Sequence, residues 1–365
     1  MSKKIIFPLI LLLTWTSFSI LDAQTKPSKP VFSDGPYLFY KDHGVVAKWM
    51  ENNQLQERTF NIGEDIDLPK GLSPDFDLHF EDLENRPVRQ EEINFTTNGP
   101  IVALSDVHGQ YLVTLKLLRE NRIIDENNNW IFGNGHLVLV GDIFDRGDQV
   151  TELLWFFHKL EKQAPKSGGR VHVLLGNHEL MILTGDLRYV HKKYRYTMAI
   201  MQTPLNELFN KDSYLGAWLR SRPLAITIND MAFVHGGFSE LLLQKTNSLK
   251  TINRLGQKSI DMEPDAIDQD SSLLDFLGTL DGPLWYRGYF DKEQVSKRNA
   301  DGILKKLGKK HIIVGHTSHE AIVSLFGNKI IGVDSSIKFG KRGEILIVDR
   351  GDFYRGTVQG ERIKL

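Results

Sequence analysis

The stretch Leu137–Gln149, LVLVGDIFDRGDQ, sets the organisation of the chain. Four apolar residues, Leu137–Val140, run directly into a glycine-punctuated segment with two carboxylates and a guanidinium, Asp142, Asp145 and Arg146. A short continuous apolar run is typical of a strand that is buried on both faces, as in a parallel sheet. In open α/β sheets, ligands bind at the loops that follow the carboxyl ends of the strands. The stretch therefore predicts a buried strand followed by a functional loop.

The same arrangement occurs before and after this stretch. The apolar run Ile101–Leu104 precedes SDVHG, and Val171–Leu175 precedes GNHE. Asp142 lies 36 positions after Asp106, and Asn177 lies a further 35 positions along the chain. Each interval fits one strand–helix–strand unit, which needs roughly 30 or more residues. Three successive parallel strands are therefore expected to deliver these polar loops to one edge of one sheet.

Composition limits the classes of function. With 365 residues, 41% hydrophobic and 25% charged, the chain can form one large or two modest domains with a substantial core. Its formal net charge of -1 provides no basic surface of the kind that binds nucleic acid, so no such partner is expected. The chain has no cysteine, which excludes disulfides, thiolate nucleophiles and thiolate metal ligands. Any metal site would have to use imidazole, carboxylate and amide groups.

Residues 1–23 have the pattern of an export signal. Lys3 and Lys4 precede the apolar run Ile5–Leu13, and Ala23 stands before a polar linker. A positive start, a short apolar core and a small residue before the break are typical of a cleaved secretory signal peptide. The alternative is an uncleaved N-terminal membrane anchor. Both interpretations predict an exported protein, periplasmic or secreted, and cleavage would leave no stable membrane span.

The rest of the chain divides into two parts. Residues 24–99 are expected to form a linker and an N-terminal β extension, with a hairpin between residues 37 and 50 and loops over 59–99. An α/β core is predicted over 100–365, with helical inserts at about 186–222 and 240–280.

Within the core, crossover helices are predicted over Tyr111–Glu120 and Thr151–Glu161, where apolar residues recur at helical spacing. Residues 223–234 are interpreted as a hairpin around an Asn-Asp turn, and residues 311–348 as the closing strands. The aromatic and basic segment Tyr189–Tyr196 has two interpretations. It is either a cap over the site or a solvated helix with an aromatic seam.

Polar residues gather at the ends of the predicted strands. They are Asp106, His108, Asp142, Asn177, His235 and His316. One alternative is that they only form turns, which Asp and Asn favour. However, carboxylate, imidazole and amide groups are the ligands expected for a first-row transition metal in the absence of sulfur. Six ligands exceed what one ion takes while keeping positions for water, so two ions with Asp142 as the bridge fit better. Two ions about 3.5–4 Å apart can clamp an in-line displacement at phosphorus.

These motifs resemble those of a known family. The blocks are SDVHGQ (105–110), GDIFDRG (141–147), GNHE (176–179), VHGG (234–237) and GHT (315–317). Together they resemble the five signature blocks of calcineurin-like metallophosphoesterases. The DRG and HGG motifs are similar to those of the phosphoprotein-phosphatase branch of this family. The segment GPLWYRG (282–288) resembles the corresponding segment of the Shewanella-like bacterial phosphatases. The resemblance implies a four-layer α/β sandwich, with two mixed β-sheets flanked by helices, helical inserts and an N-terminal β-hairpin extension. Residues 100–365 would then be the catalytic domain.

The resemblance also implies roles for individual residues. The first metal would be held by Asp106, His108 and Asp142, and the second by Asp142, Asn177, His235 and His316. His178 matches the general acid that protonates the leaving oxygen, and Asp145 matches the carboxylate that orients it. Substrate phosphate would be contacted by Arg146, Asn177 and Arg287, although the sequence around Arg287 departs from the eukaryotic pattern.

The expected function is therefore that of an exported dinuclear-metal phosphatase. It would hydrolyse phosphomonoesters by direct attack of metal-bound hydroxide, with Mn, Fe or Zn as cofactor and a phosphorylated protein or small phosphoester as substrate. Phosphotyrosine and phosphoserine/threonine both remain open, as does the oligomeric state. One alternative is a nucleotide or dinucleotide polyphosphate hydrolase of the diadenosine tetraphosphatase type, with Trp285, Tyr286 or the Tyr189–Tyr196 segment stacking on a base. The other is a non-enzymatic metal-binding envelope protein.

Overall fold

The computed structural model describes residues 30–365 except 62, 70, 71, 74, 77, 80, 81, 84, 85, 88–91, 262–270 and 292–295. The predicted signal peptide lies outside the described residues. Residues Phe32–Leu365 cluster into one compact unit. In the described part of the chain, none of the helices is long and apolar enough to cross a membrane.

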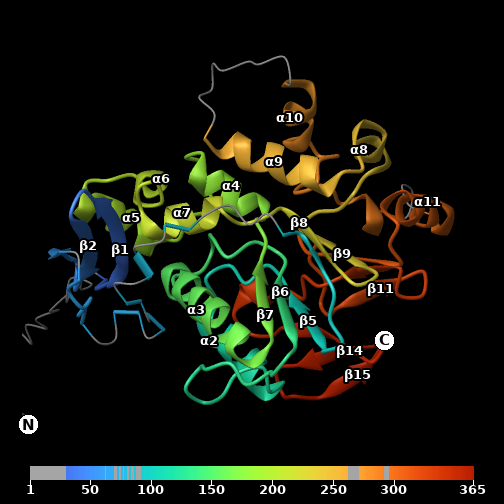
Figure 1. Cartoon of the computed structure of the whole chain (residues 1–365), viewed down its shortest axis with the longest axis horizontal. Helices are drawn as coiled ribbons and strands as arrows, with labels where there is room; N and C mark the ends of the chain where they lie inside the picture. The colour runs from blue at the N-terminus through green and yellow to red at the C-terminus, as the bar shows by residue number, and fades with distance from the viewer. Residues whose placement is uncertain are drawn as a thin grey trace, which may run out of the picture. The chain divides into compact units, whose positions relative to one another are not determined.

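The first of two six-stranded sheets carries the predicted parallel strands (Figure 1). Its order is β15-β14-β13-β5-β6-β7. The strands are β5 (Ile101–Leu104), β6 (His136–Leu139), β7 (Arg170–Val173), β13 (Glu344–Asp349), β14 (Asp352–Thr357) and β15 (Arg362–Lys364). As predicted, β5, β6 and β7 are parallel, whereas β13 pairs with β5 in antiparallel fashion. The sheet is therefore mixed.

The second sheet has the order β11-β12-β10-β9-β8-β4. Its strands are β4 (Asn94–Phe95), β8 (Ala225–Ile228), β9 (Met231–Val234), β10 (His311–Val314), β11 (Val323–Leu325) and β12 (Ile330–Gly332). The predicted hairpin forms between β8 and β9, and β10 is parallel to both β9 and β12. The expectation of loops over 59–99 is wrong at residues 59–61, which end a strand, and at β4, which pairs parallel with β8. A strand of two residues is too short to produce a sequence period.

The two sheets pack face to face because side chains alternate along each strand. In β6, Val138 points into a core that also contains Phe233 and Ile313 of the second sheet. Leu137 and Leu139 point the other way and join the apolar cluster beneath the helices. Both faces of the strand are buried, which explains the continuous apolar run in the sequence.

Helices cover the outer face of each sheet (Figure 1). Packed with the first sheet are α2 (Tyr111–Glu120), α3 (Val150–Gln163) and η1 (Ala164–Ser167). The same apolar cluster continues through α4 (Asn177–Leu183), α5 (Lys192–Met201), α6 (Leu205–Leu208) and α7 (Tyr214–Arg220), and α5 and α7 contact the N-terminal strands. Packed with the second are α8 (Glu240–Lys245), α9 (Leu249–Ile260), α10 (Ser271–Leu277), η2 (Gly288–Phe290) and α11 (Lys297–Leu307). A further short helix is η3 (Ile337–Phe339). The layers confirm the predicted α/β sandwich, and helices form in both expected inserts.

The N-terminal extension forms a three-stranded antiparallel sheet. It consists of β1 (Asp34–Lys41), β2 (Gly44–Glu51) and β3 (Gln54–Asn61) in that order. The hairpin β1–β2 confirms the prediction, and β3 extends it. The ring of Tyr37 lies 5.5 Å from the ring of Phe209, and the indole of Trp155 donates to the carbonyl of Pro36 at 3.1 Å. The extension thus shares a core with helix α3 and the first insert.

Candidate active site

The loops that follow β5 and β6 are joined by their backbones. The amide of Asp106 donates to the carbonyl of Gly141 at 3.1 Å, and the amide of His108 donates to that of Asp142 at 3.0 Å. The loop after β10 joins them, because the amide of His316 donates to the Asp106 carboxylate at 2.9 Å. All six predicted ligands are buried, namely Asp106, His108, Asp142, Asn177, His235 and His316. The structure therefore brings the predicted set together at the carboxyl ends of the strands.

Two glycines allow this close approach. A Cβ atom on Gly176 would lie 2.1 Å from Oδ1 of Asp142, and one on Gly315 would lie 2.7 Å from Oδ2 of Asp106. Both separations are far below van der Waals contact. Only glycine at these positions lets the neighbouring strand ends come within reach of the carboxylates.

Much of the site has a left-handed backbone. The φ angles are 56° at Asp106, 40° at His108, 63° at Asp142, 72° at Asp145, 65° at Arg146 and 64° at His316. Residues other than glycine adopt this backbone conformation rarely, because it costs about 1–3 kcal/mol for each of them. Tight hydrogen bonding between the loops keeps these residues in place, and such strain is typical of functional sites.

One cluster of ligands is formed by Asp142, His235 and His316. Nδ1 of His235 lies 2.7 Å from the carbonyl oxygen of Val140, so in the neutral ring this nitrogen carries the proton. Nε2 then directs a lone pair toward Oδ1 of Asn177 at 2.9 Å and Oδ1 of Asp142 at 3.2 Å. Three lone-pair atoms thus converge, as in a site that binds a cation.

The charges around this cluster also favour a cation. Burial lowers the pKa of His235, but the adjacent Asp142 carboxylate outweighs burial and raises the pKa to about 10, so that without an ion Nε2 holds a proton, which a bound cation would displace. Burial and the neighbouring His235 lower the pKa of His316 to about 2. Nε2 of His316 is buried and has no hydrogen-bonding partner among the described residues. His316 is therefore a neutral ring with a free nitrogen, which is the form that binds a metal.

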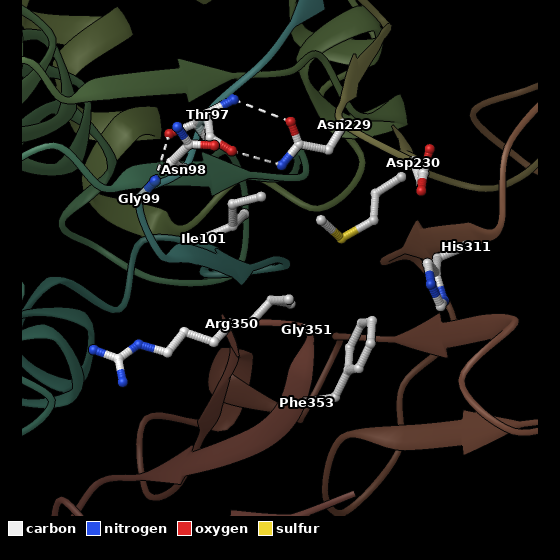
Figure 2. A pocket seen from close by; sticks show the side chains of 12 residues that line it. Thr97, Asn98, Gly99, Ile101, Asn229, Asp230, His311, Arg350, Gly351 and Phe353 are labelled. Atoms are coloured by element: carbon white, nitrogen blue, oxygen red, sulfur yellow. Dashed lines mark hydrogen bonds between the residues drawn. The ribbon is translucent and has the colours of Figure 1, made fainter.

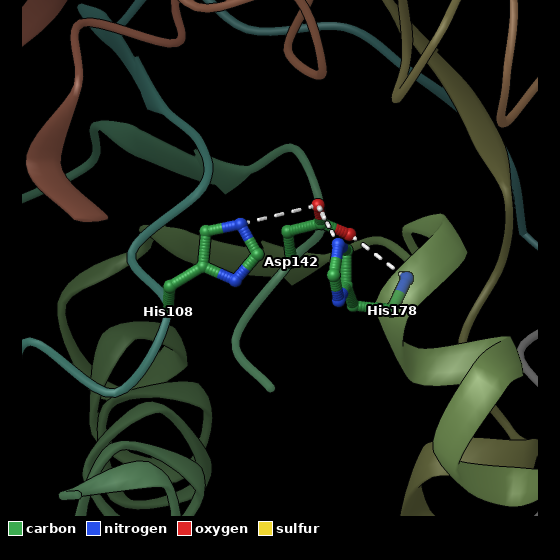
Figure 3. A group of neighbouring side chains, drawn as sticks. All are labelled: His108, Asp142 and His178. Atoms are coloured by element: carbon green, nitrogen blue, oxygen red, sulfur yellow. Dashed lines mark hydrogen bonds and ion pairs between the residues drawn. The ribbon is translucent and has the colours of Figure 1, made fainter. Parts of the chain in front are cut away.

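A second cluster is formed by His108, Asp142 and His178, which Figure 3 shows gathered around the Asp142 carboxylate. Nδ1 of His108 lies 2.6 Å from the carbonyl oxygen of Phe144, which orients the ring. Nε2 of His108 lies 3.5 Å from Oδ2 of Asp142 and 3.8 Å from Oδ1 of Asp106. Asp142 belongs to both clusters, and its role as a bridge between two ions stays a prediction.

His178 also faces this second cluster. Its Nδ1 lies 2.5 Å from Oδ2 of Asp145, a buried carboxylate, and its Nε2 lies 3.9 Å from Oδ2 of Asp142. The pairing with Asp145 is the one that the resemblance implies. With Nδ1 engaged, only Nε2 remains to meet a substrate oxygen or a metal ion, so the role as acid stays a prediction.

Both predicted arginines are exposed beside the site. The amide of Arg146 donates to the carbonyl of Tyr189 at 3.0 Å, which fixes the DRG loop against the first insert. The guanidinium of Arg287 donates to the carbonyl of His316 at 2.5 Å, so it is held next to a predicted ligand. Their contact with phosphate remains a prediction.

The structure adds Glu179, to which sequence reasoning gave no role. This fully buried carboxylate accepts hydrogen bonds from four backbone amides in two loops. They are Gly176 (2.6 Å), Asp142 (2.8 Å), Ile143 (2.7 Å) and Phe144 (3.2 Å). Glu179 thus ties the loop after β6 to the start of α4. A glutamate at the third position of a helix that follows a buried strand is the sequence signal that would have found it.

Residues 99–320 match the model of the calcineurin-like phosphoesterase family, and the chain belongs to that family. Its fold and site therefore define a metallophosphoesterase, a hydrolase acting on phosphoric esters. Within the family it is similar to Shewanella-like protein phosphatase 1 of Plasmodium berghei (strain Anka). The two are 33% identical over 264 residues, which cover 67% of this chain and 68% of the relative.

One solved structure has a higher sequence identity to this chain than the Plasmodium relative has. It is that of the cold-active protein-tyrosine phosphatase of a psychrophilic Shewanella species, which is 40% identical. Its TM-score is 0.81, and the match covers 92% of this chain and 99% of that chain. The predicted resemblance to Shewanella-like phosphatases is confirmed, and a purely non-enzymatic role finds no support. A more distant relative is the symmetrical bis(5'-nucleosyl)-tetraphosphatase of Methylococcus capsulatus, 27% identical over 161 residues, or 43% of this chain and 51% of the relative.

A separate hollow of about 350 Å³ lies at the other end of the strands (Figure 2). Its lining includes Ile101, Met231 and His311, which begin strands β5, β9 and β10, whereas the predicted ligands follow those strands. The side chain of Asn229 accepts from the amide of Thr97 at 3.0 Å and donates to its carbonyl at 2.9 Å, which closes one wall. This hollow is therefore distinct from the candidate active site.

Proposed function

We propose that this phosphatase is an exported enzyme with two metal ions that hydrolyses phosphomonoesters, with phosphorylated proteins as its substrates. The observation that carries the proposal is the position of Asp142, whose carboxylate belongs to two ligand clusters at once. Calcineurin-like folds use divalent metal ions, and the donor set here contains only oxygen and imidazole nitrogen. That set suits Mn, Fe or Zn.

We assign the residues to the two ions as the sequence suggests. One ion would be held by Asp106, His108 and Asp142, and the other by Asp142, Asn177, His235 and His316. When bound, the ions supply Lewis acidity, which polarises the phosphate and lowers the pKa of water. The orienting hydrogen bonds of His108 to Phe144 and of His235 to Val140 hold the two rings in the orientation that a ligand needs.

The remaining side chains act on the substrate. Arg146 and Arg287 would bind phosphate oxygens by charge-assisted hydrogen bonds and stabilise the charge that develops during displacement. His178 would donate a proton from Nε2 to the departing oxygen, since Asp145 holds Nδ1 and keeps the ring in place. Without this proton, an alkoxide or phenoxide would have to leave as an anion.

Support for a phosphoprotein substrate comes from the relatives. Those with the higher identity are a protein phosphatase and a protein-tyrosine phosphatase. The diadenosine tetraphosphatase alternative has a weaker basis in the relative of Methylococcus capsulatus. It also has one structural observation in its favour, because the half-buried Trp285 ring lies 5.9 Å from the ring of His316 and could stack on a base.

A metal-resolved activity panel tests the proposal. The purified chain is stripped with a chelator, and Mn, Fe, Zn or Mg is restored singly and in pairs. Phosphotyrosine and phosphoserine peptides are compared with a dinucleotide polyphosphate. We expect metal-dependent release of phosphate from peptides, with two ions bound per chain at full activity. Turnover confined to the dinucleotide would favour the alternative, and full activity with one ion per chain would contradict the dinuclear site.

Export is tested separately. The proposal rests on residues 1–23, where two lysines precede an apolar run and a small residue. We expect the mature protein in the periplasmic or secreted fraction, with a new N-terminus near Ala23. A cytoplasmic chain that keeps its N-terminal residues would refute export, and a membrane-bound chain that keeps them would indicate the anchor.

A further inference from the structure

The loop between α4 and α5 places one aromatic residue, Tyr189, at the edge of the candidate active site. Tyr189 is 46% exposed, although its ring lies beside the buried imidazole of His178. Its carbonyl accepts the amide of Arg146 at 3.0 Å, so the loop is tied to the DRG segment. The position of Tyr189 is therefore set by the site itself.

The ring of Tyr189 contacts two groups of the proposed chemistry. Its centroid lies 5.4 Å from that of the His178 imidazole, with the planes inclined at 52°. The guanidinium carbon of Arg146 lies 5.3 Å from the same ring. Tyr189 thus stands beside both the predicted proton donor and a predicted phosphate ligand.

A second guanidinium helps to fix this ring. The guanidinium carbon of Arg188 lies 5.6 Å from the Tyr189 centroid. Arg188 is itself held by the Asp186 carboxylate through hydrogen bonds of 2.7–3.0 Å. Cations near an aromatic ring are attracted to its electron-rich face. A ring held in this way loses little conformational freedom when another ring stacks on it.

We propose that Tyr189 determines specificity by stacking on the aromatic ring of a phosphotyrosine leaving group. The inference rests on the proposed phosphomonoesterase function and names its substrate class. In phosphotyrosine the ring is bonded directly to the leaving oxygen, and that oxygen must lie next to Nε2 of His178 to receive its proton. The substrate ring is then carried to where Tyr189 stands. In phosphoserine only a methylene occupies this place, and Tyr189 gains no partner.

A competing role for Tyr189 would be to orient the His178 ring. The two roles predict opposite substrate dependence. If Tyr189 stacks on substrate, its loss lowers kcat/KM for every substrate with an aromatic ring near the leaving oxygen. If Tyr189 positions the acid, its loss lowers kcat/KM most for substrates with a basic leaving oxygen, whether or not they are aromatic. Benzyl phosphate and p-nitrophenyl phosphate separate these cases, because both carry a ring but only benzyl phosphate has a strongly basic leaving oxygen.

The experiment compares Tyr189→Ala, Tyr189→Leu and Tyr189→Phe with the unmodified metal-loaded enzyme. Each is assayed on matched phosphotyrosine and phosphoserine peptides, benzyl phosphate and p-nitrophenyl phosphate. We expect the alanine and leucine variants to lose about threefold to tenfold in kcat/KM on all three aromatic substrates, as typical aromatic-pair energies imply. The phosphoserine peptide should be unaffected, and the phenylalanine variant should behave as the unmodified enzyme.

Three outcomes would overturn the inference. Equal losses on both peptides, or losses that follow the basicity of the leaving oxygen, would make Tyr189 structural or positioning. Unchanged kcat/KM in all variants would give it no role. Failure of the proposed function is distinguishable, because the unmodified enzyme would then hydrolyse none of the four substrates.

Discussion

At the scale of single residues, the site combines groups that we propose to contact substrate or metal with groups that hold the loops in place. The predicted ligands and His178 belong to short motifs in the sequence, and their convergence at one site could be predicted from residue type and order. Their directions could not. The orientation of His108 depends on the carbonyl of Phe144, and that of His235 on the carbonyl of Val140. Such backbone partners leave no trace in the sequence.

The role of His178 gives the first prediction. Replacing it by Asn removes the proton donor but keeps a polar side chain of similar size beside Asp145. We expect kcat to fall by about 10²–10⁴-fold on an alkyl phosphate, the range for general acid catalysis, and by much less on p-nitrophenyl phosphate. Steady-state kinetics on both substrates checks this. An equal fall on both would argue that His178 acts as a metal ligand instead.

Glu179 gives the second prediction. Its carboxylate accepts four amide hydrogen bonds, and an amide at this position would turn a donor toward backbone donors. Glu179→Gln should therefore lower the free energy of unfolding by about 1–3 kcal/mol and weaken metal retention. Urea unfolding and metal analysis after dialysis measure the two effects. Glu120→Gln, at an exposed position of α2, is the control and should change neither.

At the scale of elements, the buried strands and crossover helices were predictable because each has a strong apolar period. The short β4 and the last two strands, β14 and β15, were not, because none of them has such a period, and neither was the way the N-terminal sheet packs. Its attachment depends on a buried charged network that joins distant segments. Lys193 of α5 lies 2.9 Å from Glu152 of α3 and 3.4 Å from Asp34 of β1. Nothing in the sequence distinguishes these three residues from charged residues on the surface.

The third prediction concerns this network. Lys193→Met would leave the buried carboxylate of Asp34 and the partly exposed carboxylate of Glu152 without their cation. Breaking a buried ion pair from one side costs about 3–5 kcal/mol, so we expect a clear fall in the thermal midpoint. Activity should fall too, because Tyr194 of the same helix accepts the amide of Val150, just after the DRG loop, at 2.6 Å.

Calorimetry and kinetics on one preparation measure both effects. The neighbouring Lys192 is exposed, and Lys192→Met should leave both quantities unchanged. A stable, fully active Lys193→Met protein would show that the N-terminal sheet does not depend on this network.

At the scale of the whole described unit, buried neutral histidines make the free energy of unfolding depend on pH. Burial and nearby cations lower the pKa of His158 to about 3, and burial and His136 lower that of His172 to about 3. Burial lowers the pKa of His136 itself to about 4. Below about pH 6.5 the unfolded chain protonates these rings while the folded chain does not, so acid favours unfolding.

The fourth prediction follows from this sign. Stability should fall as the pH decreases from about 6.5 toward 4, by about 1.4 kcal/mol per pH unit for each such histidine. Urea unfolding at several pH values measures the slope. His158→Gln keeps a polar partner for Tyr214, but glutamine cannot titrate. The stability of this variant should therefore depend less steeply on pH, by the contribution of one histidine. An unchanged slope would mean that His158 is protonated in the folded state.

The left-handed backbone of the site has a consequence for the evolution of the protein. Stabilising substitutions are easiest to find where the chain is strained, and several of the strained residues lie in the loops of the candidate active site. Replacement of Asp145 by glycine, for example, would relieve its φ of 72° while removing the partner of His178. A population selected only for heat resistance would therefore be expected to accept substitutions in its active site among others, and to keep its fold while its activity declines.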